Sequence, residues 1–182
     1  MDIQFSSKQL YGGAIEAEFP SSVSDLSQVT FVPDNQEVFT DLNTEATLIL
    51  DLLERAECQD ENSAAYHYND LAGQNESSGP GQSTIISTRE ISPQEMPNIP
   101  ADWKKYIIKG QMLIKPDKGQ FTDRDLVNIL MLIIRIAEVE TDIVFHINLP
   151  VKERIDQENA MIEKYFKRFM ESFKINDMGL FG

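Results

Sequence analysis

"DLVNILMLIIRIAEVETDIVFHINLP", residues 125–150, is the stretch that decides the fold of this chain. Its first part, residues 125–137, is almost continuously apolar, which is typical of a strand that is buried on both faces. In its last part, residues 141–150, the side chains alternate between two faces, as in a second strand. The few residues "EVET" between them predict an antiparallel hairpin. The alternating sets are Ile143, Phe145, Ile147 and Leu149 against Asp142, Val144, His146 and Asn148.

The neighbouring segments extend this hairpin and cover it. Residues 104–115, "KKYIIKGQMLIK", have the pattern of a strand. Residues 151–175 carry apolar side chains at spacings of seven, four, three and four, which places them on one helical face. We expect this face to pack on the sheet rather than on a partner helix, and Glu163 to form a weak surface pair with Lys167. The apolar positions are Ile155, Ile162, Phe166, Phe169 and Phe173.

Two further strands are predicted near the N-terminus. In residues 13–19, "GAIEAEF", apolar and acidic side chains alternate with period two, and we expect Glu16 and Glu18 on the solvated face. Residues 35–40, "NQEVFT", follow Pro33, which fixes its own dihedral and favours extended geometry before it. The fold class is therefore α+β, an antiparallel sheet with helices packed on it.

Residues 46–57, "ATLILDLLERAE", fit either a helix or a strand, and propensity favours the helix. In both cases Asp51 and Glu54 lie near the end of an apolar element, where we expect them to point to solvent. Residues 61–73 predict a short helix that is closed by Gly73 and has Tyr66 as its apolar contact.

The composition changes at residues 73–102, which are rich in Gly, Ser and Pro. We expect flexible excursions there around a short strand at residues 84–91. Because neither flank alone would make a good core, the whole chain, residues 1–182, is predicted to be one domain.

Charge and cysteine content restrict the classes of partner. Sixteen basic and thirty acidic residues give a net charge of −14. Such a field repels nucleic acid and anionic membrane and favours a basic protein partner.

Cys58 is the single cysteine, so no internal disulfide forms. The start lacks an apolar signal core and the longest apolar run is too short to span a membrane. We expect a monomer in the nucleus and cytoplasm.

Catalytic chemistry has little support in the sequence. It contains no phosphate-binding glycine loop, metal-spaced cysteine or histidine cluster, or nucleophile elbow. His67 and His146 are read as structural histidines. We therefore predict that the protein is not an enzyme and needs no cofactor or metal.

The segment "FVPDNQEVFTD", residues 31–41, groups amides and carboxylates between apolar flanks. A turn that leads into a strand explains Pro33 and Asp34. It does not explain the grouping, although spacing alone favours this structural interpretation over a binding surface.

Several motifs, in this order, resemble the Ran guanine nucleotide release factors, the Mog family of Ran-binding proteins. They are "LYGGAIEAEFP", "VPDNQEVF", "LILDLLE", "RIAEVETDIVFHINLP" and the ending "GLFG", whereas residues 57–120 match poorly. The resemblance implies a central antiparallel sheet sandwiched by helices, similar to the PsbP proteins, and makes residues 47–53 a strand. It also implies binding to the GTPase Ran, release of Ran's GTP without covalent catalysis, and a role in nuclear protein import.

The resemblance further implies a Ran-binding patch. The family's acidic residues map onto Asp51 and Glu54, and the loop "PDNQE" is expected beside them. Their carboxylates would pair with basic residues near the nucleotide pocket of Ran and compete with the γ-phosphate for a lysine or Mg²⁺. The alternatives are an acidic adaptor without nucleotide-release activity and, less favoured, a PsbP-like accessory protein. The implied site residues are Asp34, Asn35, Gln36, Glu37, Asp51 and Glu54.

Overall fold

The central hairpin predicted from the sequence forms the middle of the main sheet. In it, β8 (Asp125–Ile136) pairs antiparallel with β9 (Thr141–Pro150). The turn passes through Glu140, whose φ of 47° is left-handed. Every residue of β8 from Ile129 to Ile136 is buried, so the predicted hairpin and two-sided burial are confirmed. The computed structural model describes residues 2–115, 124–152 and 155–182.

Within the described residues the main sheet has seven strands in the order β3-β4-β5-β9-β8-β7-β6, all paired antiparallel. The predicted strands at residues 35–40, 84–91 and 104–115 are confirmed as β4, β6 and β7. The remaining strands of this sheet are β3 (Val23–Asp25), β4 (Gln36–Asp41), β5 (Thr47–Glu54), β6 (Ser83–Glu90) and β7 (Lys104–Ile114).

The segment that fits both patterns, residues 46–57, contains β5, so the helix favoured by propensity is wrong and the strand implied by the resemblance is confirmed. β5 lies between β4 and β9 and is paired with both. Leu48 and Leu50 are 1% exposed because their side chains enter the main core. Burial between two partner strands therefore overrides a weak local preference.

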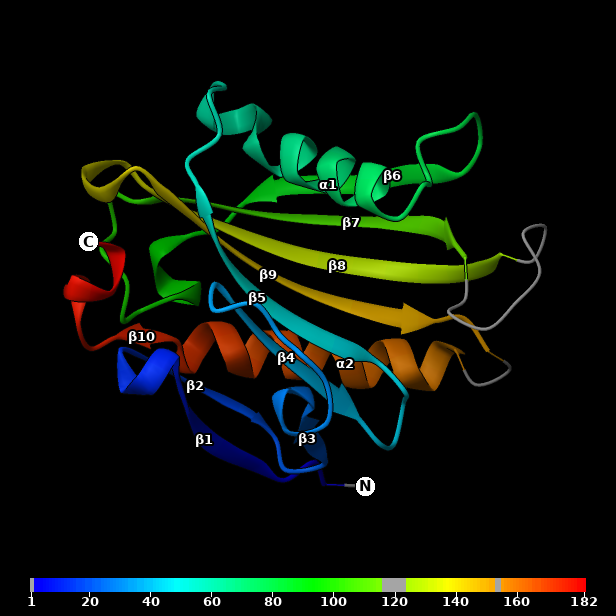
Figure 1. Cartoon of the computed structure of the whole chain (residues 1–182), viewed down its shortest axis with the longest axis horizontal. Helices are drawn as coiled ribbons and strands as arrows, with labels where there is room; N and C mark the ends of the chain where they lie inside the picture. The colour runs from blue at the N-terminus through cyan, green and yellow to red at the C-terminus, as the bar shows by residue number, and fades with distance from the viewer. Residues whose placement is uncertain (1, 116–123, 153–154) are drawn as a thin grey trace.

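Helices cover the two faces of the main sheet (Figure 1). On one face, α1 (Ser63–Gln74) packs on β7, β8 and β6. On the other face, α2 (Ile155–Ser172) shares a core with a second, smaller sheet. The sandwich implied by the resemblance is thus present. The smaller sheet consists of β1 (Phe5–Leu10), β2 (Ile15–Pro20) and β10 (Lys174–Ile175), of which β2 confirms the strand predicted at residues 13–19.

The predicted apolar face of α2 is confirmed. Phe166 and Phe169 are buried, and the rings of Phe145 and Phe169 stack with their centroids 3.7 Å apart. The expected pair of Glu163 with Lys167 is wrong, because Glu163 pairs with Lys109 of β7 and Lys167 with the next turn of its own helix. The predicted start of this helix falls partly on residues 153–154, which lie outside the described residues.

Helix α1 differs from the prediction in two details. Gly73 lies inside the helix, which ends one residue later. Tyr66 is half exposed, and Tyr68 is the buried aromatic residue instead. The hydroxyl of Tyr68 is shared between the carbonyl oxygens of Thr84 (3.0 Å) and Gln111 (2.9 Å), which ties α1 to β6 and β7. The predicted helix is present, but the sequence did not show which tyrosine meets the sheet.

The segment after β6 packs on the core through Ile91, Met96 and Ile99, which are all buried. Lys105 is buried beneath it and donates to the carbonyl oxygens of Pro100 (3.0 Å) and Trp103 (2.8 Å). These bonds fix the path of the chain into β7. Among the described helices, none combines the length and the apolar character needed to cross a membrane.

Candidate partner-binding surface

The loop before β4 is fastened to the end of β5. The carbonyl oxygen of Asn35 accepts from the N–H of Leu52 (2.9 Å), and Asn35 Nδ2 donates to the Leu52 carbonyl oxygen (3.3 Å). The carbonyl oxygen of Pro33 accepts from the N–H of Gln36 (2.9 Å), which closes a turn. Because β4 and β5 run antiparallel, this turn brings Asp34 to the end of β5. The segment is therefore both a structural turn and part of a surface.

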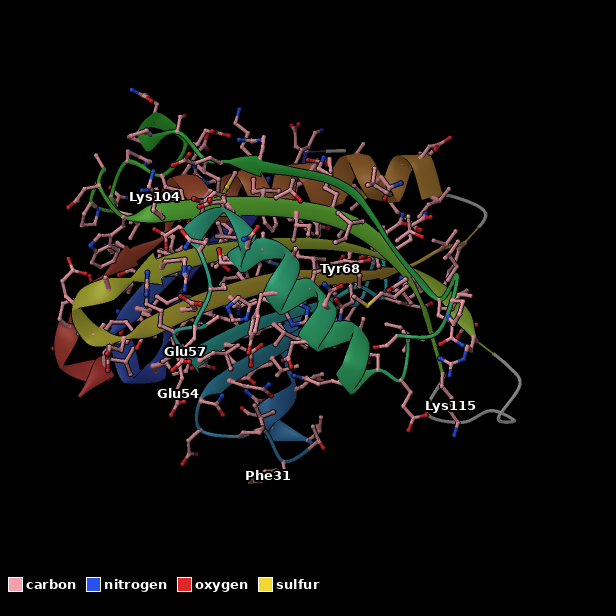
Figure 2. All side chains as sticks on the ribbon, turned by 90° about the horizontal axis from the view of Figure 1, so that it is seen from above. Phe31, Glu54, Glu57, Tyr68, Lys104 and Lys115 are labelled. Carbon is pink, nitrogen blue, oxygen red and sulfur yellow. The ribbon has the colours of Figure 1, made fainter. Side chains whose placement is uncertain are left out.

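A groove of about 840 Å³ lies between this loop, the β8–β9 turn and the C-terminal 3₁₀ turn (Met178–Phe181). Figure 2 shows two of its acidic residues, Glu54 and Glu57, next to each other. Arg55 is the basic residue among the lining residues, and it is paired with Asp60 at 3.0 Å. The groove therefore carries a concentrated negative field. Its exposed carboxylates are Asp34, Glu54, Glu57 and Glu140.

The prediction that Asp51 points to solvent is wrong. It is 7% exposed and faces the α1 side of the sheet, because alternate residues of β5, including Leu50 and Leu52, face the other side. Its Oδ2 lies 3.6 Å from Nε2 of His146, and its Oδ1 is buried without a hydrogen-bond partner. Gln36, the cross-strand partner of Asp51, lines a second, smaller pocket together with Asp51 on this side of the sheet. Two of the predicted site residues are thus separated from the acidic groove.

Glu37 is half-buried and holds the smaller sheet against β4. Its Oε1 accepts from the backbone N–H of Tyr11 at 2.6 Å. The hydroxyl of Tyr11 in turn bonds the carbonyl oxygens of Leu50 (2.8 Å) and Asn35 (3.1 Å). Burial raises the pKa of Glu37, although the Tyr11 N–H partly offsets this. Glu37 therefore has a structural role through its bond to Tyr11.

A buried ion network fixes the wall of the groove that follows β5. Nε of Arg135 donates to Oδ1 of Asp142 (3.1 Å), and Nη1 donates to Oδ1 of Asp60 (2.9 Å). Oδ2 of Asp142 accepts from the N–H of Ala56 (3.0 Å) and from Nε2 of His67 (2.8 Å). Ionised Asp142 is only an acceptor, so Nε2 of His67 carries the proton.

The charge state of Asp142 follows from this network. Burial by itself raises the pKa of Asp142, but the hydrogen bonds from His67 and Ala56 and the charge of Arg135 outweigh it, so that the pKa lies below its usual value. Both histidines are buried and bonded, in agreement with their structural interpretation, since Nδ1 of His146 lies 2.9 Å from Oδ1 of Asn148. The network holds the segment that carries Glu57.

Sequence reasoning missed Glu57 and Glu140 as groove residues. Glu140 lies in the short "EVET" turn, and its charge was the available signal. Glu57 follows the strand that the resemblance places at residues 47–53, but no pattern in the sequence showed the direction of the chain after it. Among the described residues, no group of three or more His, Cys, Asp or Glu side chains is placed to hold a metal ion.

Comparison with known proteins places this geometry in a family context. The model of the family described as "Ran-interacting Mog1 protein" matches residues 8–150. The chain is 30% identical over 185 residues to the Ran guanine nucleotide release factor of Danio rerio, covering 97% of this chain and 100% of that protein. It is 29% identical over 194 residues to a probable Ran guanine nucleotide release factor of Dictyostelium discoideum, covering 100% and 98%. Its fold is similar to the crystal structure of the Saccharomyces cerevisiae Ran-binding protein Mog1p, with a TM-score of 0.74, 22% identity and full coverage of both chains.

Proposed function

This chain belongs to the Mog1 family of Ran-interacting proteins, and from that premise we propose that it binds the small GTPase Ran and promotes release of Ran's bound GTP. The function serves nuclear protein import, the process named for the Mog1 relative of Schizosaccharomyces pombe. The protein acts in the nucleus and cytoplasm as a regulator without covalent catalysis.

The acidic groove is the observation that carries this proposal. Four exposed carboxylates meet where the end of β5, the loop before β4 and the β8–β9 turn come together. A small GTPase holds its nucleotide phosphates with basic groups and Mg²⁺. Carboxylates presented to those groups compete with the γ-phosphate for them. The groove is thus suited to the cationic surroundings of a nucleotide pocket.

Release follows from differential affinity. If the protein binds the empty GTPase more tightly than the loaded form, thermodynamic linkage requires that it weakens nucleotide binding by the same factor. No bond in the nucleotide breaks. In this mechanism Asp34, Asn35 and Glu54 contact Ran directly, and Glu37 holds the smaller sheet against β4. Asp51 and Gln36 contribute from the α1 side of the main sheet.

The test is release of fluorescent GTP from Ran. We expect wild-type protein to accelerate release and Glu54→Ala to reduce this acceleration about tenfold, which corresponds to about 1.4 kcal/mol of lost interaction. The matched control is Asp125→Ala, which removes an exposed carboxylate at the start of β8, away from the β8–β9 turn.

Equal acceleration by wild type and Glu54→Ala would remove the groove from the mechanism. Tight binding to Ran with no change in the release rate would favour the alternative function, an acidic adaptor that binds through the same surface.

A further inference from the structure

Two large apolar side chains project from the β3–β4 loop, residues 26–35. Among the described large apolar residues Phe31 is the most exposed, at 88%, and Val29 follows at 80%. Figure 2 shows Phe31 at the outer edge of the molecule, on the side where Glu54 and Glu57 lie. Scattered apolar residues are ordinary on a protein surface, so the position of this pair has to decide its meaning.

The β3–β4 loop holds Phe31 between two hydrogen-bonded turns. Before it, the N–H of Thr30 donates to the carbonyl oxygen of Leu26 (3.0 Å), and after it the N–H of Gln36 donates to the carbonyl oxygen of Pro33 (2.9 Å). The ring of Pro33 also fixes the backbone dihedral at that position. Because the chain is fastened on both sides, the exposed ring is presented to a partner at a small cost in conformational entropy.

Phe31 lies close to the acidic groove. Asp34, which lines the groove, follows it by three residues, and three residues span at most about 11 Å. Asn35, the next residue, is bonded to Leu52 of β5. A partner that covers Asp34 and Glu54 with an interface of ordinary size, about 800 Å² on each side, therefore reaches Phe31 as well.

An aromatic ring supplies what the groove lacks. The exposed carboxylates of the groove orient a basic partner and speed the encounter, but solvent and salt screen them, so they add little to the lifetime of a complex. A phenyl ring that leaves water for an apolar depression gains free energy that depends little on salt, and aromatic residues are enriched at interface cores. The two kinds of contact are complementary.

We infer that Phe31 is an apolar anchor of the partner interface, with its ring inserted into an apolar depression of Ran beside the basic residues that face the groove. Val29 packs at the rim of the same contact. The inference rests on the proposed function for the identity of the partner. It goes beyond the acidic contacts, because the ring acts by burial of apolar surface. A second copy of this chain is a poorer occupant, since two chains of net charge −14 repel each other.

The test compares Phe31→Ser with Leu42→Ser in calorimetric titrations with Ran at low and high salt. Leu42 is a matched control because it is 73% exposed and lies beyond the other end of β4, in the turn before β5. We expect Phe31→Ser to weaken the affinity about tenfold at both salt concentrations, and Leu42→Ser to leave it unchanged. Phe31→Leu should retain most of the affinity, because it keeps an apolar side chain at this position.

Two further measurements separate anchoring from a structural or electrostatic role. The melting temperatures of both serine variants should equal that of wild type, since neither change removes a buried side chain. The heat capacity change of binding should be less negative for Phe31→Ser than for wild type, because less apolar surface is buried. Equal affinities of Phe31→Ser and Leu42→Ser, or a loss for Phe31→Ser that disappears at high salt, would overturn the inference.

Failure of the anchor and failure of the proposed function give different results. If wild type binds Ran and Glu54→Ala is impaired while Phe31→Ser binds like wild type, the anchor is wrong and the proposed function stands. If wild type does not bind Ran, both are wrong. Self-association of wild type in sedimentation experiments that Phe31→Ser abolishes, with unchanged affinity for Ran, would assign the ring to a second copy of the chain and overturn the inference.

Discussion

At the scale of single residues, Asp142 connects the stability of the protein to the position of its groove. It receives donors from Arg135, His67 and the N–H of Ala56, which lie on three different parts of the chain. A carboxylate whose pKa is lowered in the folded state contributes stability above its unfolded pKa of about 3.9 and loses it as the pH falls through the lower folded pKa. Asp142 therefore stabilises the fold at neutral pH.

Asp142→Asn is expected to lower the free energy of unfolding at neutral pH by about 3 kcal/mol, because it removes the buried counter-charge of Arg135 and leaves only the partly exposed Asp60 as its partner. The stability of this variant should also depend less on pH below about pH 4 than that of wild type. Urea unfolding over a series of pH values measures both effects. An unchanged acid dependence would contradict a lowered pKa of Asp142 in the folded protein.

At the scale of elements, the contact of α1 with β7 depends on a glycine. A Cβ atom at Gly110 would lie 2.3 Å from the Tyr68 hydroxyl and 2.5 Å from the Thr84 carbonyl oxygen. Since Tyr68 is 0% exposed and bonded to the backbone of β6 and β7, neither neighbour has room to move away. The close approach of helix and strand therefore requires glycine.

Gly110→Ala is expected to destabilise the protein by about 1–3 kcal/mol, because the added methyl group overpacks this contact. Gly73→Ala is the matched control, since a Cβ there would meet no atom closer than 3.9 Å and the residue lies inside α1. That variant should instead stabilise by about 0.5–1 kcal/mol through helix propensity. Urea denaturation of the two variants compares the effects, and a shift of the same sign in both would contradict this packing.

At the scale of the whole molecule, the net charge of −14 is concentrated in part at the acidic groove. Such a field speeds the encounter with a cationic partner surface, and salt screens it over about 10 Å at 0.1 M ionic strength. The charge therefore acts on the rate of association with Ran more than on the lifetime of the complex.

The association rate constant with Ran should fall by an order of magnitude or more from low to high salt. The triple variant Glu54→Gln, Glu57→Gln, Glu140→Gln should reduce this salt dependence. Stopped-flow measurements over a salt series test it. A control triple variant loses three exposed charges elsewhere. If the control reduces the salt dependence of the association rate equally, net charge alone matters. The control changes are Asp2→Asn, Asp125→Asn and Asp156→Asn.

The family and the architecture were readable from the sequence, because long apolar patterns and ordered motifs leave few alternatives. The predicted hairpin, the sheet-facing helix α2 and the α+β class are confirmed. Membership of the Mog1 family, inferred from motifs such as "VPDNQEVF", is confirmed by the family match over residues 8–150. The pattern of β5 was ambiguous, since its apolar residues fit both periods, and the short strands β1, β3 and β10 were not predicted.

By itself, the sequence determined the apolar periods, the hairpin turn, the excess of negative charge and the chemical types available to bind a basic partner. Those properties are local or additive along the chain. Tertiary structure alone decided that Glu54 joins Asp34 at the groove, whereas Asp51, three residues earlier, enters a separate pocket beside His146. The physical reason is that successive side chains of a strand point to opposite faces, and only the packing of α1 and the smaller sheet determines what each face meets.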